Sequence, residues 1–80
     1  MSTKAFVLME TAVATSRDVV ATLHALPGVR SVDAVTGPYD IIATVEGPDL
    51  NAVGDLVTRR IHTIAGINRT VTCLSVGSTS

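Results

Sequence analysis

The sequence has little of the chemistry that small enzymes and nucleic-acid-binding domains commonly use. Among 80 residues there is no tryptophan, one phenylalanine, one tyrosine and one cysteine. A single cysteine, Cys73, excludes an internal disulfide, and without a Cys/His cluster no structural zinc site is expected. Sheets that bind RNA stack bases on aromatic side chains, so this aliphatic chain is not expected to be an RNA-binding sheet.

Long hydrophobic runs and an excess of charge are also missing. No apolar run approaches the roughly 20 residues that span a bilayer, and the first residues lack the apolar core of a signal peptide. A cytoplasmic protein with no membrane partner is therefore expected. The formal net charge is −1 at pH 7, which offers little cationic surface to a nucleic acid.

Aliphatic residues are what the chain does have, because 46% of it is hydrophobic. A domain of this size buries only about 60–65% of its unfolded surface, and its core contributes only a few kcal/mol of net stability. With disulfides and zinc excluded, self-association is the leading remaining source of stability.

Apolar periodicity and turn residues divide the chain into strands and helices within one domain over residues 1–80. Strands are expected over residues 4–11, 29–36, 40–47 and 67–76. Thr15 or Ser16 is placed to cap a first helix that ends at Pro27-Gly28, and a second helix begins at Pro48-Asp49 and ends before Gly66. The ordered part is expected at about residues 4–76, before a frayed tail.

The order βαββαβ, with right-handed crossovers, predicts an α+β fold of the ferredoxin-like type. Its four-stranded antiparallel sheet carries both helices on one face. In the first strand Phe6 and Leu8 point one way, whereas Ala5, Val7 and Met9 point the other. Because both sets are apolar, the face without helices is an exposed aliphatic patch, and a second copy is its simplest cover.

The stretch "VTGPYD", residues 35–40, is the densest group of special residues in the chain. One interpretation is a strand-turn-strand connection, with Gly37 and Pro38 setting the turn. The other is a binding site, in which amides near Gly37 hold a carboxylate and Asp40 holds an ammonium group. Such a site suits the zwitterionic end of an amino acid.

Thr70 and Thr72 share one face of the last expected strand. They either add hydroxyls to this site or follow ordinary β-propensity. Cys73, in the same strand, is interpreted as a small core residue. His24 and His62 end the two helices, where capping or solvation explains them and neither has the spacing of a metal ligand.

Four stretches of the sequence resemble a known family. "LPGV" before the second strand, "TGPYDIIATVE", a helix with "DLNAVGDLV" and a final "INRTVTCLSV" are similar to the effector-binding (RAM) domain of the Lrp/AsnC family, the leucine- and asparagine-responsive regulators. The similarity extends from about Lys4 to Val76. Its most specific part is the Gly37-Pro38-Tyr39-Asp40 stretch.

The resemblance implies a βαββαβ domain that dimerises through its sheets and assembles further, commonly into an octamer. It implies an amino-acid effector in a cleft between dimers, with no cofactor and no enzymatic activity. The ligand-binding residues it implies are Thr36, Gly37, Tyr39, Asp40, Thr70 and Thr72.

The chain differs from full-length members of this family, which begin with a helix-turn-helix DNA-binding domain. We therefore expect a stand-alone version of the binding domain, with full-length regulators as candidate partners. Two alternatives remain open: a small dimeric α/β-barrel enzyme of monooxygenase or isomerase type, and a purely structural oligomerisation module.

This sequence predicts that the isolated chain does not bind DNA. Its net charge is −1, and the only basic pair is Arg59-Arg60, so few counterions would be released on binding a duplex. A gel shift at low salt should show free DNA only. Tight binding that weakens steeply with added salt would contradict this prediction.

Overall fold

The computed structural model describes residues 2–77, and the expected frayed tail lies partly outside them, at residues 78–80. The elements are β1 (Thr3–Thr11), α1 (Ser16–His24), β2 (Val29–Ala34), β3 (Ile41–Gly47), α2 (Leu50–Asp55), η1 (Leu56–Ile61) and β4 (Ile67–Leu74). The βαββαβ order is confirmed, and each element lies within a few residues of its predicted position.

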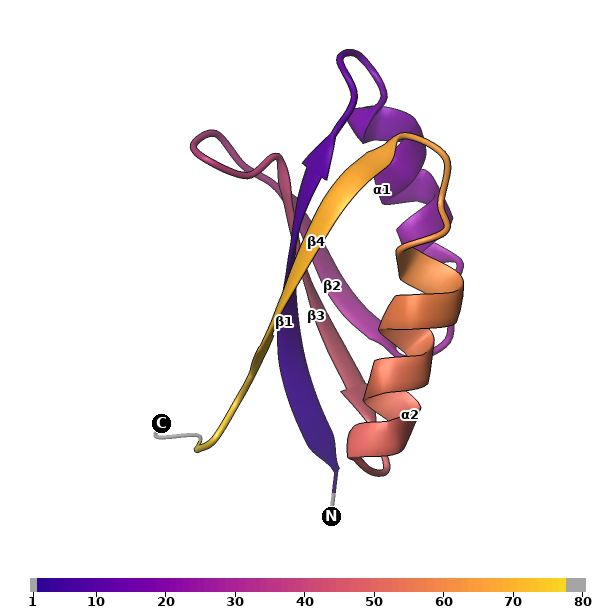
Figure 1. The fold of residues 1–80 in the computed structure, drawn as a ribbon, viewed down its shortest axis with the longest axis vertical. Coiled ribbons are helices and arrows are strands. Elements are labelled where there is room, and N and C mark those ends of the chain that lie inside the picture. Colours follow the sequence, from indigo (N-terminus) through magenta and orange to yellow (C-terminus); the bar gives the residue numbers. More distant parts are fainter. Residues whose placement is uncertain (1, 78–80) are drawn as a thin grey trace.

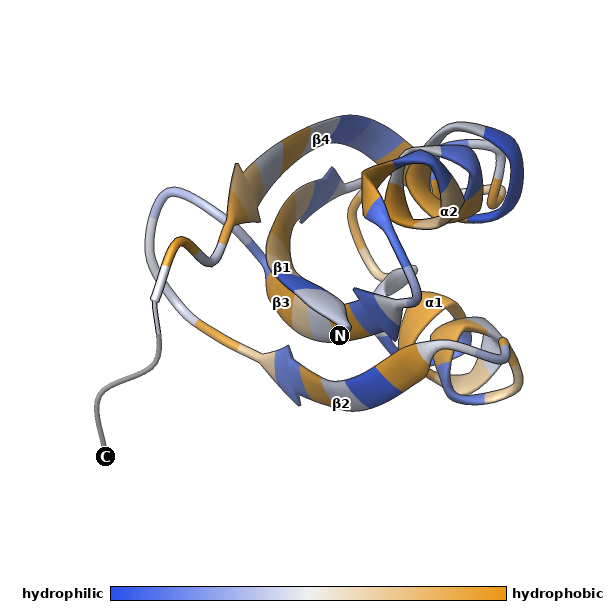
Figure 2. Cartoon of the chain, turned by 90° about the horizontal axis from the view of Figure 1, so that it is seen from below, coloured by the Kyte–Doolittle hydropathy of each residue, from blue (hydrophilic) through white to orange (hydrophobic). Residues whose placement is uncertain are grey.

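The four strands form one antiparallel sheet in the order β2-β3-β1-β4. Both helical segments cover the same face of this sheet, and the opposite face carries no helix (Figures 1 and 2). The ferredoxin-like arrangement predicted from the sequence is therefore confirmed. The central strands are β1 and β3, and the edges are β2 and β4.

The hydrophobic core lies between the central strands and the helices. Every second residue of β1 and β3 is buried on this side, and the helices bury an apolar stripe against them. The core consists of Ala5, Val7, Met9, Val19, Leu23, Ile41, Ala43, Val45, Val53, Val57 and Ile61. The two edge strands contribute no buried residue, so the core is narrow.

The sheet face without helices, here called the open face, has its own apolar cluster. Strand pairing places Phe6 beside Thr44 and Cys73, and Leu8 beside Ile42 and Val71. Phe6, the only phenylalanine, keeps 38% of its surface exposed. The prediction that Cys73 is a core residue is wrong: Cys73 is an exposed free cysteine on this face.

The start of α1 differs from the sequence expectation. Thr15 occupies the N-cap position, but its hydroxyl donates to the carbonyl of Ala12 at 2.7 Å and makes no side-chain cap. The expected capping bond is therefore absent, because this hydroxyl closes the preceding turn instead.

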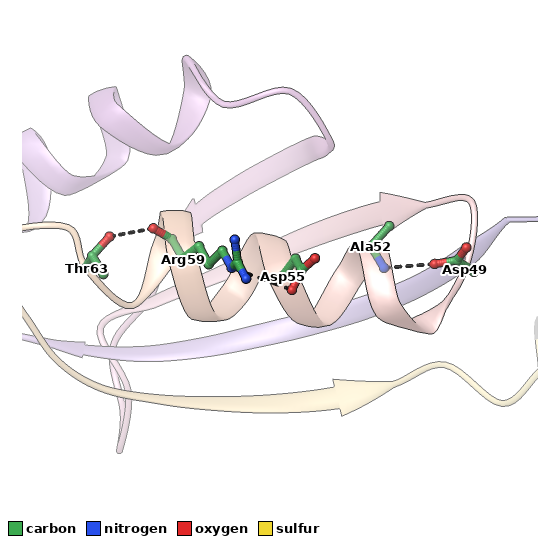
Figure 3. Close-up of polar contacts among 5 residues, drawn as sticks. All are labelled: Asp49, Ala52, Asp55, Arg59 and Thr63. Carbon is green, nitrogen blue, oxygen red and sulfur yellow. Dashed lines mark hydrogen bonds and ion pairs between the residues drawn. The ribbon is translucent and has the colours of Figure 1, made fainter.

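The second helical segment begins as the sequence predicts. Asp49 caps α2 by accepting a 2.8 Å hydrogen bond from the amide of Ala52 (Figure 3). The segment then widens into the π-helix η1, which the apolar spacing did not predict. Along its exposed side, Arg59 pairs with Asp55 at 3.8 Å, and the hydroxyl of Thr63 donates to the Arg59 carbonyl (Figure 3). Within residues 2–77 no helix has both the length and the apolarity to cross a bilayer.

Two glycines give a matched test of this packing. A Cβ on Gly66, whose φ is +99°, would lie 2.9 Å from the Thr15 hydroxyl, whereas a Cβ on Gly54 in α2 would meet nothing within 4 Å. Gly66→Ala is expected to lower the free energy of unfolding by about 2 kcal/mol. Gly54→Ala is expected to raise it by about 0.5–1 kcal/mol, since alanine favours the helix. Urea denaturation at one protein concentration measures both, and equal signs would contradict the described backbone.

Candidate functional site

The hairpin between β2 and β3 contains four of the six predicted site residues. The amide of Val35 donates to the carbonyl of Asp40 at 2.9 Å, which closes a loop of residues 36–39. Gly37 has a φ of +146°, which strongly favours glycine. Thr36, Gly37 and Pro38 are exposed, whereas Tyr39 is half-buried. The loop bends away from the helix-covered face (Figure 1).

Asp40 joins this hairpin to the end of β1. Its amide donates to the carbonyl of Met9, and its carboxylate Oδ2 accepts the amide of Thr11, both at 2.9 Å. The pairing of β1 with β4 shifts register between Glu10 and Thr11, so the side chain of Asp40 satisfies an amide beside this irregularity. Among the described residues Oδ1 accepts no hydrogen bond.

Thr70 and Thr72 lie elsewhere. They pair with Met9 and Val7 across β1, and so they face the helices, on the far side of β1 from the hairpin. The hydroxyl of Thr70 and Nδ1 of His62 share a 3.2 Å hydrogen bond. Thr72 lines a hollow of about 290 Å³ between β4 and α2, together with Leu50 and Leu74. Within one chain the two threonines do not join the hairpin residues.

Two further hollows lie away from the hairpin as well. One, of about 420 Å³, runs between the α1–β2 turn and α2, with Arg59 and Arg60 on its wall. The other, of about 380 Å³, lies between the start of α1 and Gly66. None of the three is lined by a hairpin residue. These three hollows are therefore separate from the hairpin.

Sequence reasoning missed two polar residues near the hairpin. The hydroxyls of Thr11 and Ser16 lie 2.9 Å apart and are half-buried, and Thr11 also contacts Asp40 through its amide. Only the register of β1 against β3 brings Thr11 to Asp40. The sequence offered little signal for this contact, because the link from β1 to α1 begins with Ala12, Val13 and Ala14.

Two surface ion pairs lie at the ends of the strands. Arg69 contacts Glu10 at 3.4 Å, and Arg30 contacts Glu46 at 3.4 Å. Pairs this exposed contribute roughly 0–1 kcal/mol. Within residues 2–77 no three His, Cys, Asp or Glu side chains are grouped to hold a metal ion.

The amino-acid sequence is similar to those of known transcriptional regulators. The chain is 33% identical over 61 residues to an HTH-type transcriptional regulator of Pyrococcus furiosus, a match covering 76% of this chain and 41% of that protein. The chain thus spans less than half the length of the curated relatives that it matches.

Solved structures agree with the fold. A protein from Thermus thermophilus superimposes with a TM-score of 0.91 at 33% identity, over 98% of each chain. A feast or famine regulatory protein from M. tuberculosis, solved with L-methionine, superimposes with a TM-score of 0.82 at 26% identity, over 98% of this chain and 52% of that one.

A sequence model of one family matches nearly the whole chain, over residues 4–79. The matched region contains the complete βαββαβ unit and the β2–β3 hairpin. The chain belongs to the Lrp/AsnC ligand-binding domain family.

Proposed function

We propose that this domain binds an amino-acid effector at the β2–β3 hairpin and acts as a binding and assembly module without catalysis. The observation that carries the proposal is that the β2–β3 hairpin, with Gly37, Tyr39 and Asp40, lies inside the region that matches the Lrp/AsnC ligand-binding domain. A relative that is similar over 98% of this chain was solved with L-methionine, which supports an amino acid as the effector class.

The chemistry of the hairpin supports a zwitterionic ligand. The exposed backbone at Gly37 offers amide donors to a carboxylate, and the free Oδ1 of Asp40 offers an acceptor to an ammonium group. Tyr39, half-buried beside them, offers an apolar ring to the side chain of the ligand. In this proposal Thr36 also contacts the ligand, whereas Thr70 and Thr72 take part only if another copy brings their face near.

Assembly completes the site in this proposal. The open face pairs two copies sheet to sheet, because it presents an apolar cluster that water would otherwise contact. Further association, up to an octamer, places the hairpin of one dimer against another dimer, which adds a wall to the site. Full-length Lrp/AsnC regulators are partners of the same chemistry, since they contain the same domain.

The effector site is tested by a thermal-shift screen of the amino acids, L-methionine included. Stabilisation should rise with ligand concentration as RT ln(1 + [L]/Kd). Asp40→Asn keeps the acceptor oxygen for Thr11 but removes the charge, so it should weaken binding about 10-fold or more, equivalent to ~1.4 kcal/mol.

Asp55→Asn is the matched control for this variant. It removes an equal charge from an exposed ion pair on α2 and should bind as the parent does. Calorimetry measures both variants. If Asp40→Asn binds as tightly as the parent, the carboxylate charge has no part in recognition and the hairpin is a turn only.

The open face is tested by light scattering at micromolar concentration, where the parent should contain no monomer. Phe6→Glu places a charge in the centre of the open face and should yield monomer, because a charge buried between two sheets is strongly unfavourable. Leu50→Glu changes a more exposed apolar residue, 56% exposed, outside the open face and should leave the dimer intact. A parent protein that is monomeric would contradict the sheet-to-sheet dimer.

A further inference from the structure

The loop between β1 and α1, residues 12–15, is held by contacts from three directions. The amide of Ala12 donates to the carbonyl of Gly66 at 2.7 Å, and the hydroxyl of Thr15 donates back to the Ala12 carbonyl. At its base, Thr11 bonds Asp40 through its amide and Ser16 through its hydroxyl. The loop is thus tied to the β4 side, to α1 and to the hairpin.

The backbone of this loop does not adopt its shape by preference. Ala14 has a φ of +66°, in the left-handed region that is unfavourable for residues other than glycine. Such a conformation persists only where the surrounding contacts impose it. Val13, the residue before Ala14, is 96% exposed, so its side chain does not pack against the rest of the chain. The anchors at the base of the loop therefore decide where the loop lies.

Asp40 is the one anchor that belongs to the hairpin. Its Oδ2 is committed to the amide of Thr11 at 2.9 Å, and its side chain is half-buried between the two segments. The loop and the hairpin lie at the same end of the sheet (Figure 1). A ligand held at the hairpin through Oδ1 would therefore lie beside the segment that Oδ2 holds.

We propose that Asp40 is a positioning residue, whose Oδ2 fixes the β1–α1 loop as a second wall of the effector site. This inference rests on the proposed function, and it assigns the loop and the Thr11–Ser16 hydroxyl pair to that site. The two oxygens of one carboxylate then have separate tasks: Oδ1 receives the ammonium group of the effector, and Oδ2 keeps the wall in place.

Two substitutions of Asp40 separate these tasks. Asp40→Asn loses the charge but keeps an oxygen for the Thr11 amide, whereas Asp40→Ala loses both. The Thr11 amide should exchange with solvent about 10-fold faster or more in Asp40→Ala than in the parent, because its hydrogen bond is gone. Asp40→Asn should restore most of this protection, since the acceptor is retained.

Affinity for L-methionine, measured by calorimetry, should follow the same order. If the released loop occupies its place in about a fifth of molecules, Asp40→Ala binds about fivefold more weakly than Asp40→Asn. Ser16→Ala tests the loop without altering Asp40: it removes the 2.9 Å hydroxyl contact and should weaken binding. Thr22→Ala is the control, because it removes an exposed hydroxyl contact within α1 and should not change affinity.

The outcomes separate this inference from the proposed function. The positioning role is overturned if Asp40→Asn and Asp40→Ala lose affinity equally and Ser16→Ala keeps the affinity of the parent. The proposal that Asp40 binds the effector would survive that result. A parent that binds no L-methionine, with no other amino acid active in the screen, overturns the proposed function and this inference with it. If Asp40→Ala does not fold, the comparison of Ser16→Ala with Thr22→Ala decides.

Discussion

One-sided burial of the central strands is the constraint on which the rest of the structure depends. Ala5, Val7 and Met9 are fully buried against the helices, and the period of two in a strand then forces Phe6 and Leu8 onto the other side. Within residues 2–77 no helix covers that side. The same alternation that builds the core therefore creates an apolar surface, and the proposed pairing of two copies depends on that surface.

The pairing of β1 with β3 also fixes what lies at the end of the sheet. The antiparallel register runs from Thr3–Gly47 to Met9–Ile41, so the residue before Ile41 arrives beside the last residues of β1. Asp40 meets the Thr11 amide for this reason. A hairpin, a strand irregularity and the start of a helix converge there because the sheet ends there, and the strands beneath them provide a rigid support.

Much of the fold could be predicted from the sequence, because it follows from local patterns. Period-two runs and Gly/Pro breaks located the strands, and the parity of β1 and β3 divided their residues into two faces. Which face packs against the helices came from the structure. Cys73 was misplaced because β4 is an edge strand, where an apolar residue on the uncovered side stays exposed. The Thr15 hydroxyl and η1 depend on tertiary contacts and on helix geometry that residue types do not encode. The four hairpin residues lie together because they are neighbours in the sequence, whereas the contact between Asp40 and Thr11 joins residues 29 positions apart and was not foreseen.

The two edges of the sheet differ in their protection against pairing with foreign strands. β2 carries Arg30 and Asp33, charges that discourage edge-to-edge association. In β4 the charge of Arg69 lies near the beginning, and residues 70–74, "TVTCL", follow without charge or proline. Short uncharged segments of high β-propensity are the usual starting points of cross-β aggregation. Of the two edges, β4 is thus the one that is less protected against pairing with a strand of another chain when the protein is crowded or newly made. A partner that covers the β4 edge would therefore also protect the protein against aggregation.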